Sequence, residues 1–175
     1  MCLDHTENYP KIMSPKQVSR KRLMDVVRNP AWVCLAWFGM TAGVSLLATP
    51  VRFTATTITR EVALDVGRVV FAALDKAEFV ALIILLVLVR ASGLAKKLWA
   101  ACGALALILI VQSMWLLPEL SARTQQIIDG IEPAPSIAHG AYSVLELSKL
   151  LILLFTGLRS MQMLPNITRE SSSGA

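Results

Sequence analysis

Four long apolar runs alternate with short polar segments along this chain. They cover about residues 30–49, 66–89, 98–117 and 137–158. Each run has roughly the 20 residues that a helix needs to cross the hydrocarbon core of a bilayer. The pattern therefore predicts an all-α fold, an integral membrane four-helix bundle.

Prolines and charges set the predicted ends of these helices. The second helix is expected to start near Arg60 and to run to about Arg90. Pro118 is expected to close the third helix, because proline cannot continue a regular helix. The segments 50–60 and 118–137 are therefore predicted to be loops, and the second of them is the longest in the chain.

The composition agrees with a membrane protein and excludes a nucleic-acid partner. A soluble domain of 175 residues has too little polar surface to cover a chain that is 55% hydrophobic. The net charge is +5, but the lysines and arginines gather in the N-terminal segment and in the turn 90–97. That distribution is typical of membrane orientation, in which basic residues stay on the cytoplasmic side.

The charge pattern also predicts the domain organisation and the location. Residues 1–29 form a basic cytoplasmic tail, residues 30–159 form the transmembrane domain, and residues 160–175 form a second cytoplasmic tail. The expected location is the cell membrane (plasma or inner), with both termini cytoplasmic. The first apolar run is expected to be retained, because the polar segment before it is too long for a signal peptide.

An internal repeat divides the transmembrane domain into two helical hairpins of the same orientation, related by an axis along the membrane normal. The first helix of each hairpin matches at an offset of 68 residues, in the pairs Cys34 and Cys102, Ser45 and Ser113, and Pro50 and Pro118. The second helix matches at an offset of 71, in the pairs Arg68 and His139, Phe71 and Tyr142, Asp75 and Glu146, and Glu78 and Lys149.

Ionisable residues inside the second and fourth runs indicate a functional site, because such residues are rare within a membrane. The candidates for an ion, proton or substrate site are Asp75, Lys76, Glu78, Glu146 and Lys149. The candidates at the outer interface are Arg68, His139 and Tyr142.

Helix geometry places the central charges near the middle of the membrane. Glu78 lies about 18 Å from Arg90, and Glu146 lies about 20 Å from Arg159, at 1.5 Å per residue. The least costly arrangement places the second helix against the fourth, with Lys149 near Glu78 or Glu146. Three acids face two lysines, so one carboxyl is in excess and must be protonated, hydrated or bound to a cation.

These residues are compatible with functions of different classes. In one, the chain is a small transporter or channel-like subunit that handles protons or cations. Four helices alone form only a narrow pathway, so this function predicts a homo-oligomer or another membrane subunit as partner. In the other, it is a non-catalytic scaffold or accessory subunit whose charged stripe only fixes the helices. A metal- or redox-linked membrane protein is a weaker alternative.

No enzyme motif, cofactor or metal ligand is predicted. The chain contains no P-loop, GxSxG, HExxH or glycine-rich dinucleotide turn. His139 is alone within the membrane runs, since the other histidine, His5, lies in the tail. A paired-histidine haem site is therefore excluded.

The third and fourth runs resemble a known family. The residues that carry the resemblance are the segment from Trp115 to Arg123 (WLLPELSAR), His139, Tyr142 and Glu146, together with Phe71 in the second run. Over residues 30–160 or so they are similar to the transmembrane-protein-205-like family of small four-helix membrane proteins, whose function is largely unknown. The resemblance implies the architecture and adds little about chemistry.

Overall fold

The apolar runs are rich in leucine and alanine, which favour helices, and helices are the only regular elements in the described part of the chain. This computed structural model describes residues 23–24, 26–92 and 96–162, and no strand occurs within them. The all-α class is confirmed. In chain order the elements are α2 (Ala31–Ala42), the π-helix η1 (Gly43–Ala48), α3 (Thr49–Val51), the 3-10 helix η2 (Arg52–Thr54), α4 (Arg60–Ser92), α5 (Lys96–Val111), the π-helix η3 (Gln112–Leu116), α6 (Leu117–Ile128) and α7 (Ala138–Gln162).

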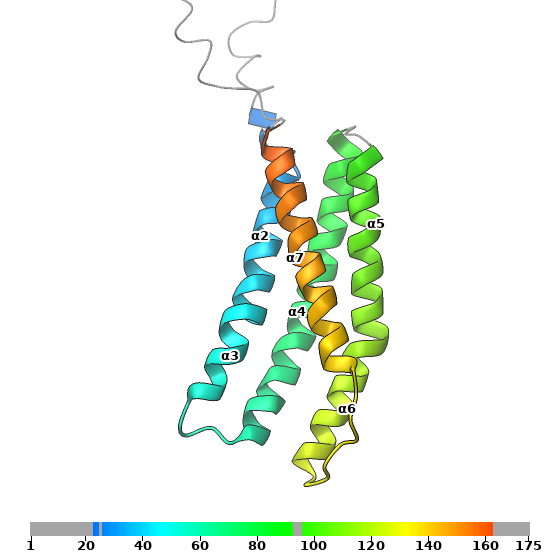
Figure 1. Ribbon diagram of the computed structural model, residues 1–175. Helices are drawn as coiled ribbons and strands as arrows, with labels where there is room; N and C mark the ends of the chain where they lie inside the picture. The colour runs from blue at the N-terminus through cyan, green and yellow to red at the C-terminus, as the bar shows by residue number, and fades with distance from the viewer. Residues whose placement is uncertain (1–22, 25, 93–95, 163–175) are drawn as a thin grey trace, which may run out of the picture.

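These elements form long rods that lie alongside one another (Figure 1). Among the described residues, three stretches are long and apolar enough to cross a membrane: Ala31–Thr54, Lys96–Ile128 and Ala138–Gln162. The rod α4 is not among them, because charged side chains interrupt its apolar run. The span predicted at 66–89 therefore stays a prediction.

Two predicted loops were wrong in part, because the helices continue past their prolines. Pro118 does not close the third helix but lies in the first turn of α6, directly after η3. Pro50 lies in the same position after η1. In an α-helix, a proline ring clashes with the carbonyl group of the residue four positions earlier. A π-turn directly before the proline changes the spacing between the ring and that carbonyl group, so the helix can continue. The first helical rod therefore reaches Thr54, and the third reaches Ile128.

The two cytoplasmic tails that the sequence predicts lie largely outside the described residues. Of the first tail, 1–29, only residues 23–24 and 26–29 are described. Of the second, 160–175, only residues 160–162 are described. The middle of the turn 90–97 is also outside the described ranges.

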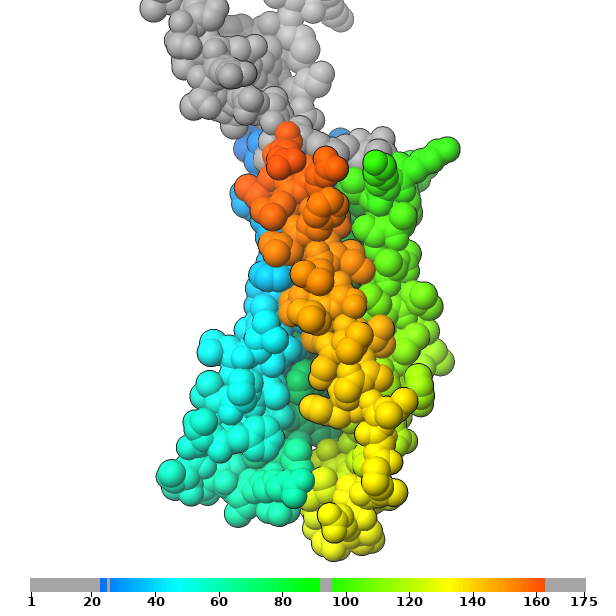
Figure 2. All heavy atoms as spheres, viewed as in Figure 1, coloured from blue at the N-terminus to red at the C-terminus, as the bar shows by residue number. Residues whose placement is uncertain are grey.

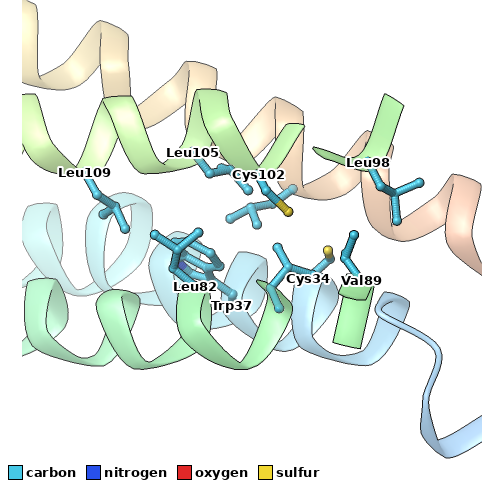
Figure 3. Packing of buried hydrophobic residues seen from close by; sticks show 10 residues of the cluster. Cys34, Trp37, Leu82, Val89, Leu98, Cys102, Leu105 and Leu109 are labelled. Carbon is cyan, nitrogen blue, oxygen red and sulfur yellow. The ribbon is translucent and has the colours of Figure 1, made fainter. Parts of the chain in front are cut away.

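An apolar core holds the rods together at the end of the molecule where α2 begins and α7 ends (Figure 3). Its fully or nearly fully buried members are Cys34, Trp37, Leu82, Leu85, Val89, Leu98, Cys102, Leu105, Leu109 and Leu153. In this half α2 and α7 are in direct contact at Gly157. A β-carbon there would lie 2.9 Å from Leu35 Cδ2, so only glycine fits without displacing a neighbour.

Toward the other end, α2 and its continuation α3 separate from α7 (Figure 1). Kinks in helices occur mostly at prolines and π-bulges, and η1 and Pro50 lie where this separation begins. The molecule therefore has a closed half, filled by the apolar core, and an open half.

Candidate functional site

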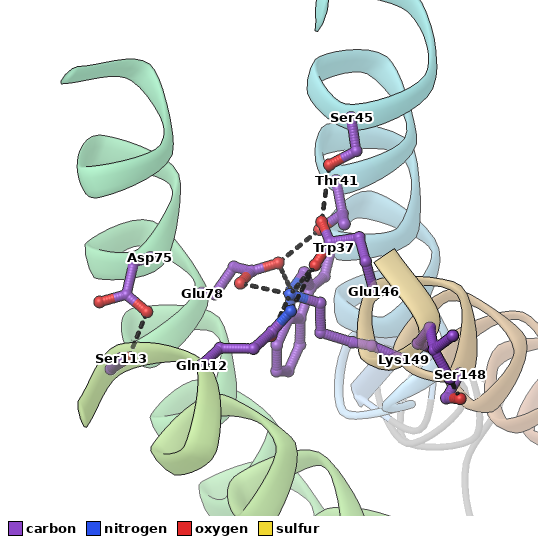
Figure 4. Close-up of polar contacts among 11 residues, drawn as sticks. Trp37, Thr41, Ser45, Asp75, Glu78, Gln112, Ser113, Glu146, Ser148 and Lys149 are labelled. Atoms are coloured by element: carbon purple, nitrogen blue, oxygen red, sulfur yellow. Dashed lines mark hydrogen bonds and ion pairs between the residues drawn. The ribbon is translucent and has the colours of Figure 1, made fainter. Parts of the chain in front are cut away.

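Lys149, on α7, is the centre of a buried polar network at the boundary between the two halves (Figure 4). Its Nζ lies 2.7 Å from Glu78 Oε2 and 2.8 Å from Glu146 Oε2. It also donates to Gln112 Oε1 at 3.0 Å. An ammonium group has three donors, so all of them are used. The sequence predicted Lys149 near one glutamate or the other, and it contacts both.

Glu78, on α4, accepts hydrogen bonds from the first rod as well as from Lys149. Its Oε1 accepts from Trp37 Nε1 at 3.0 Å and from Thr41 Oγ1 at 2.7 Å. Sequence reasoning missed Trp37 and Thr41. A signal was present, because Trp37, Thr41 and Ser45 are spaced four residues apart and so share one face of the helix.

Glu146, one turn before Lys149 on α7, has one oxygen inside the network and one at its edge. Its Oε2 accepts from Lys149 and, at 2.9 Å, from Gln112 Nε2. Among the described residues, its Oε1 has one partner, the hydroxyl of Ser45, at 2.6 Å. A hydroxyl can accept as well as donate a hydrogen bond, whereas the indole N–H that contacts Glu78 can only donate.

The network carries one carboxyl in excess. Lys149 supplies one positive charge to the two carboxyls of Glu78 and Glu146, which are 2% and 4% exposed. Two ionised carboxylates would leave one negative charge without a partner, and an uncompensated buried charge costs several kcal/mol. A proton or a cation is therefore needed to complete the site.

Asp75 and Lys76 do not join this network. Lys76 is exposed on the outer face of α4 and makes no ion pair within the described residues. Asp75 is half-buried and accepts a short hydrogen bond from Ser113, apart from the network in Figure 4. The expected balance of three acids and two lysines in one site is therefore wrong, because successive residues on α4 point in different directions.

A pocket of about 730 Å³ opens in the other half of the molecule, between η1 to η2, α4, α6 and the start of α7. Figure 2 shows the hollow between the cyan and yellow parts of the surface. Glu146 and Ser45 lie at its inner end. Its lining also includes four arginines: Arg52, Arg60, Arg68 and Arg123.

The three candidates for the outer interface all line this pocket. Arg68 donates to Gln125 Oε1 on α6 at 3.1 Å. Tyr142 is buried and packs edge-to-face on Phe71, with ring centroids 5.6 Å apart. His139 is exposed at the start of α7. The structure therefore groups them around the approach to Glu146.

Residues that match in the sequence repeat also contact each other. Phe71 contacts Tyr142, and Glu78 pairs with Lys149, each across the offset of 71 residues. The hydroxyl contacts correspond in the same way, because Ser45 meets Glu146 while Ser113 meets Asp75.

Within the described residues, no group of three or more histidine, cysteine, aspartate or glutamate side chains could hold a metal ion. Comparisons of the chain with protein-family models, curated proteins and solved structures found no match. The resemblance to the transmembrane-protein-205-like family therefore stays a prediction.

Proposed function

We propose that this chain is an integral membrane protein of two helical hairpins that couples transport to a proton or a cation, with Glu146 as the exchanging carboxyl. One observation carries the proposal. Glu146 belongs to both regions, because its Oε2 contacts Lys149 while its side chain lines the pocket. The repeat contacts support the two-hairpin arrangement.

The surroundings of Glu146 favour it over Glu78 as the group that carries the proton. When Glu146 is protonated, its O–H can donate to the Ser45 hydroxyl, and Glu78 and Lys149 remain as a balanced pair. The proton can leave through the pocket, and a cation would then compensate the carboxylate. Glu78 Oε1 also has a hydroxyl partner, Thr41, but the same oxygen accepts from the indole N–H of Trp37, and Glu78 does not line the pocket.

The membrane placement follows from the predicted topology. With both termini cytoplasmic, the pocket opens on the opposite side of the cell membrane. The apolar core closes the route from the network toward the cytoplasm. Transport therefore needs either a movement that separates α2 from α7 at Gly157, or a pathway completed by a second copy or another membrane subunit.

A scaffold function is the second candidate, and one specific observation favours it. Each Lys149 donor has an acceptor, and the network links α2, α4, η3 and α7. Such a network fixes the packing of the helices without any exchange of protons. In this function the excess carboxyl would hold its proton permanently.

The test is proton movement into sealed proteoliposomes that contain a pH-sensitive dye, driven by a potassium diffusion potential. We expect the full chain to acidify the lumen faster than empty liposomes. Glu146→Gln should reduce the rate to that of empty liposomes, because glutamine cannot exchange a proton. Lys76→Gln is the control, since Lys76 is exposed on α4 and belongs neither to the network nor to the pocket, and it should leave the rate unchanged.

Wild-type protein that acidifies the lumen no faster than empty liposomes would contradict the transport function. The same conclusion follows if Glu146→Gln and wild type have equal rates. A large loss of thermal stability in both Glu78→Gln and Glu146→Gln, without proton movement in the wild type, would support the scaffold.

A further inference from the structure

The pocket contains more positive charge than the transport of a proton or a cation requires. Glu146 is the only acidic residue among the described residues that line it. Two of the four arginines have an acid on their own helix, since Arg68 pairs with Asp65 and Arg123 lies 3.7 Å from Glu119. The other two, Arg52 and Arg60, make no ion pair with a carboxylate within the described ranges.

Arg52 is the arginine that is most clearly held in place without an anionic partner, since its guanidinium carbon lies 5.0 Å from the centroid of the Phe53 ring. Its guanidinium lies over Gly67 of α4, where a β-carbon would come within 2.2 Å of Nη1. Its Nε is buried and has no hydrogen-bond acceptor in the described part of the chain. A planar guanidinium matches the geometry of a carboxylate or a phosphate group, so Arg52 is oriented to bind an anion.

The walls of the pocket are apolar, and they reach the outer surface of the rods. Phe71 and Leu117 form part of the inner wall. Leu46 on η1 and Leu147 on α7 also line it, although both are largely exposed. The pocket therefore opens sideways, between two segments that are apolar enough to lie in lipid.

The size and the depth of the pocket agree with an amphiphile. A volume of about 730 Å³ is far larger than a single ion and falls within the range of small-molecule sites, about 300–1,000 Å³. Arg52 and Arg60 lie at the ends of their rods, whereas Glu146 lies about two turns inside α7. The pocket is therefore charged near the membrane surface and apolar deeper in the membrane. A lipid leaflet has the same order, with polar headgroups outside and hydrocarbon chains inside.

We infer that the pocket binds a single-chain anionic amphiphile, with its headgroup on Arg52 and its chain along the apolar wall toward Glu146. The inference names the substrate class of the proposed transport function and rests on that function for its biological meaning. Binding itself is measured separately from proton movement, so each can fail alone.

Binding is tested with radiolabelled dodecyl phosphate and the full chain in lipid nanodiscs. Arg52→Gln should raise the Kd at least about tenfold, the factor that corresponds to about 1.4 kcal/mol. Gly67→Ala should also weaken binding, because the added methyl group displaces the guanidinium while keeping its charge. Arg159→Gln is the matched control, since that arginine lies over Phe155 at the opposite end of α7.

Competition identifies which part of the probe is recognised. Unlabelled dodecyl phosphate should displace the label, whereas inorganic phosphate and dodecylphosphocholine should not at equal concentration. Displacement by inorganic phosphate would overturn the inference in favour of a small-anion site. Displacement by dodecylphosphocholine would overturn it by showing that the pocket does not require a net negative charge on the headgroup. Equal affinity of wild type, Arg52→Gln and Gly67→Ala, each with unchanged thermal stability, would also overturn it.

Lys76→Gln should keep its affinity for dodecyl phosphate, because Lys76 is exposed on α4 and does not line the pocket. Loss of binding in Arg52→Gln with normal proton movement supports the binding site and the transport function separately. Normal binding without any proton movement would contradict the transport function alone.

Discussion

The network around Lys149 and the arginine-lined pocket are built on the same helices, yet they treat charge in opposite ways. In the network, each ammonium donor has an acceptor and the side chains are almost fully buried. In the pocket, four arginines surround a cavity with one acid at its inner end. Lys149 is fully paired where the helices touch, whereas two of the four pocket arginines, Arg52 and Arg60, have no carboxylate partner among the described residues. Glu146 belongs to both regions and is therefore the residue expected to act.

The cause of the difference lies in two local features, one on α7 and one on the first rod. At one end, Gly157 allows α7 to pack directly on Leu35 and Cys34. At the other, the π-turn η1 and Pro50 carry the rod away from α7. The difference between the closed network and the open pocket therefore depends on backbone packing as well as on the charges. Substitutions in each region can test it.

The largest effect is expected from Lys149→Met, which breaks the closed region. Removing the ammonium leaves two buried carboxyls facing each other, and breaking a buried ion pair costs about 3–5 kcal/mol. Thermal unfolding in nanodiscs should show a correspondingly large loss. Lys76→Met, at an exposed position on α4, should lose no stability. Equal losses in the two variants would show that the network does not stabilise the fold.

A smaller effect should separate the two glutamates. Both oxygens of Glu78 accept from N–H donors, so in Glu78→Gln the amide N–H must face either the Lys149 ammonium or the indole N–H of Trp37. The variant should lose about 1–3 kcal/mol of unfolding free energy, as expected for an unsatisfied buried group. If Glu146 carries the proton, as the proposed function requires, Glu146→Gln replaces a neutral carboxyl and should lose less than about 1 kcal/mol. Chemical denaturation of both variants measures the difference. The reverse order would assign the proton to Glu78.

Gly157→Ala tests the contact that closes the molecule. Its β-carbon would lie 2.9 Å from Leu35 Cδ2 and 3.3 Å from Cys34 Cβ. Overpacking of this kind costs roughly 1–3 kcal/mol. The control is Gly39→Ala, where the added carbon meets nothing within 4 Å and alanine favours the helix. If Gly157→Ala is as stable as Gly39→Ala, then α2 and α7 are not closely packed there.

The smallest effect is expected at the boundary between the regions. Phe71→Leu removes the edge-to-face contact with Tyr142 and should cost about 0.5–1.5 kcal/mol beyond the area lost. It should not change the rate of proton movement by itself, because neither ring is charged. A collapse of proton movement in this variant would place the aromatic pair in the pathway.

Much of the fold was predictable because hydrophobic length and helical spacing are local properties of the sequence. The helices and the faces of Glu78 and Lys149 follow from periodicity. The repeat paired Phe71 with Tyr142 only as equivalent positions, and their contact is known from the structure. The end of the third helix was not predictable, because Pro118 is accommodated by a π-turn whose formation depends on packing.

The site was predicted only in part, for a physical reason. Charge counting pointed to an excess carboxyl but placed Lys76 in the balance, although that side chain lies outside. The pocket and the position of Arg52 were missed entirely. Both arise because η1 and Gly67 set the distance between rods that are remote in sequence, and no local pattern reports that distance.

The most direct test of the central role of Glu146 is residue-resolved labelling with dicyclohexylcarbodiimide, which reacts with protonated carboxyls in apolar surroundings. We predict labelling of Glu146 but not of Glu78 in the wild type. Any label on Asp75 is told apart from label on Glu78 because the two residues are identified in separate proteolytic peptides. Labelling of Glu146 should disappear in Glu78→Gln, because Lys149 then balances a single carboxylate. Labelling of Glu78 alone, or no labelling of either glutamate at any pH, would contradict the account.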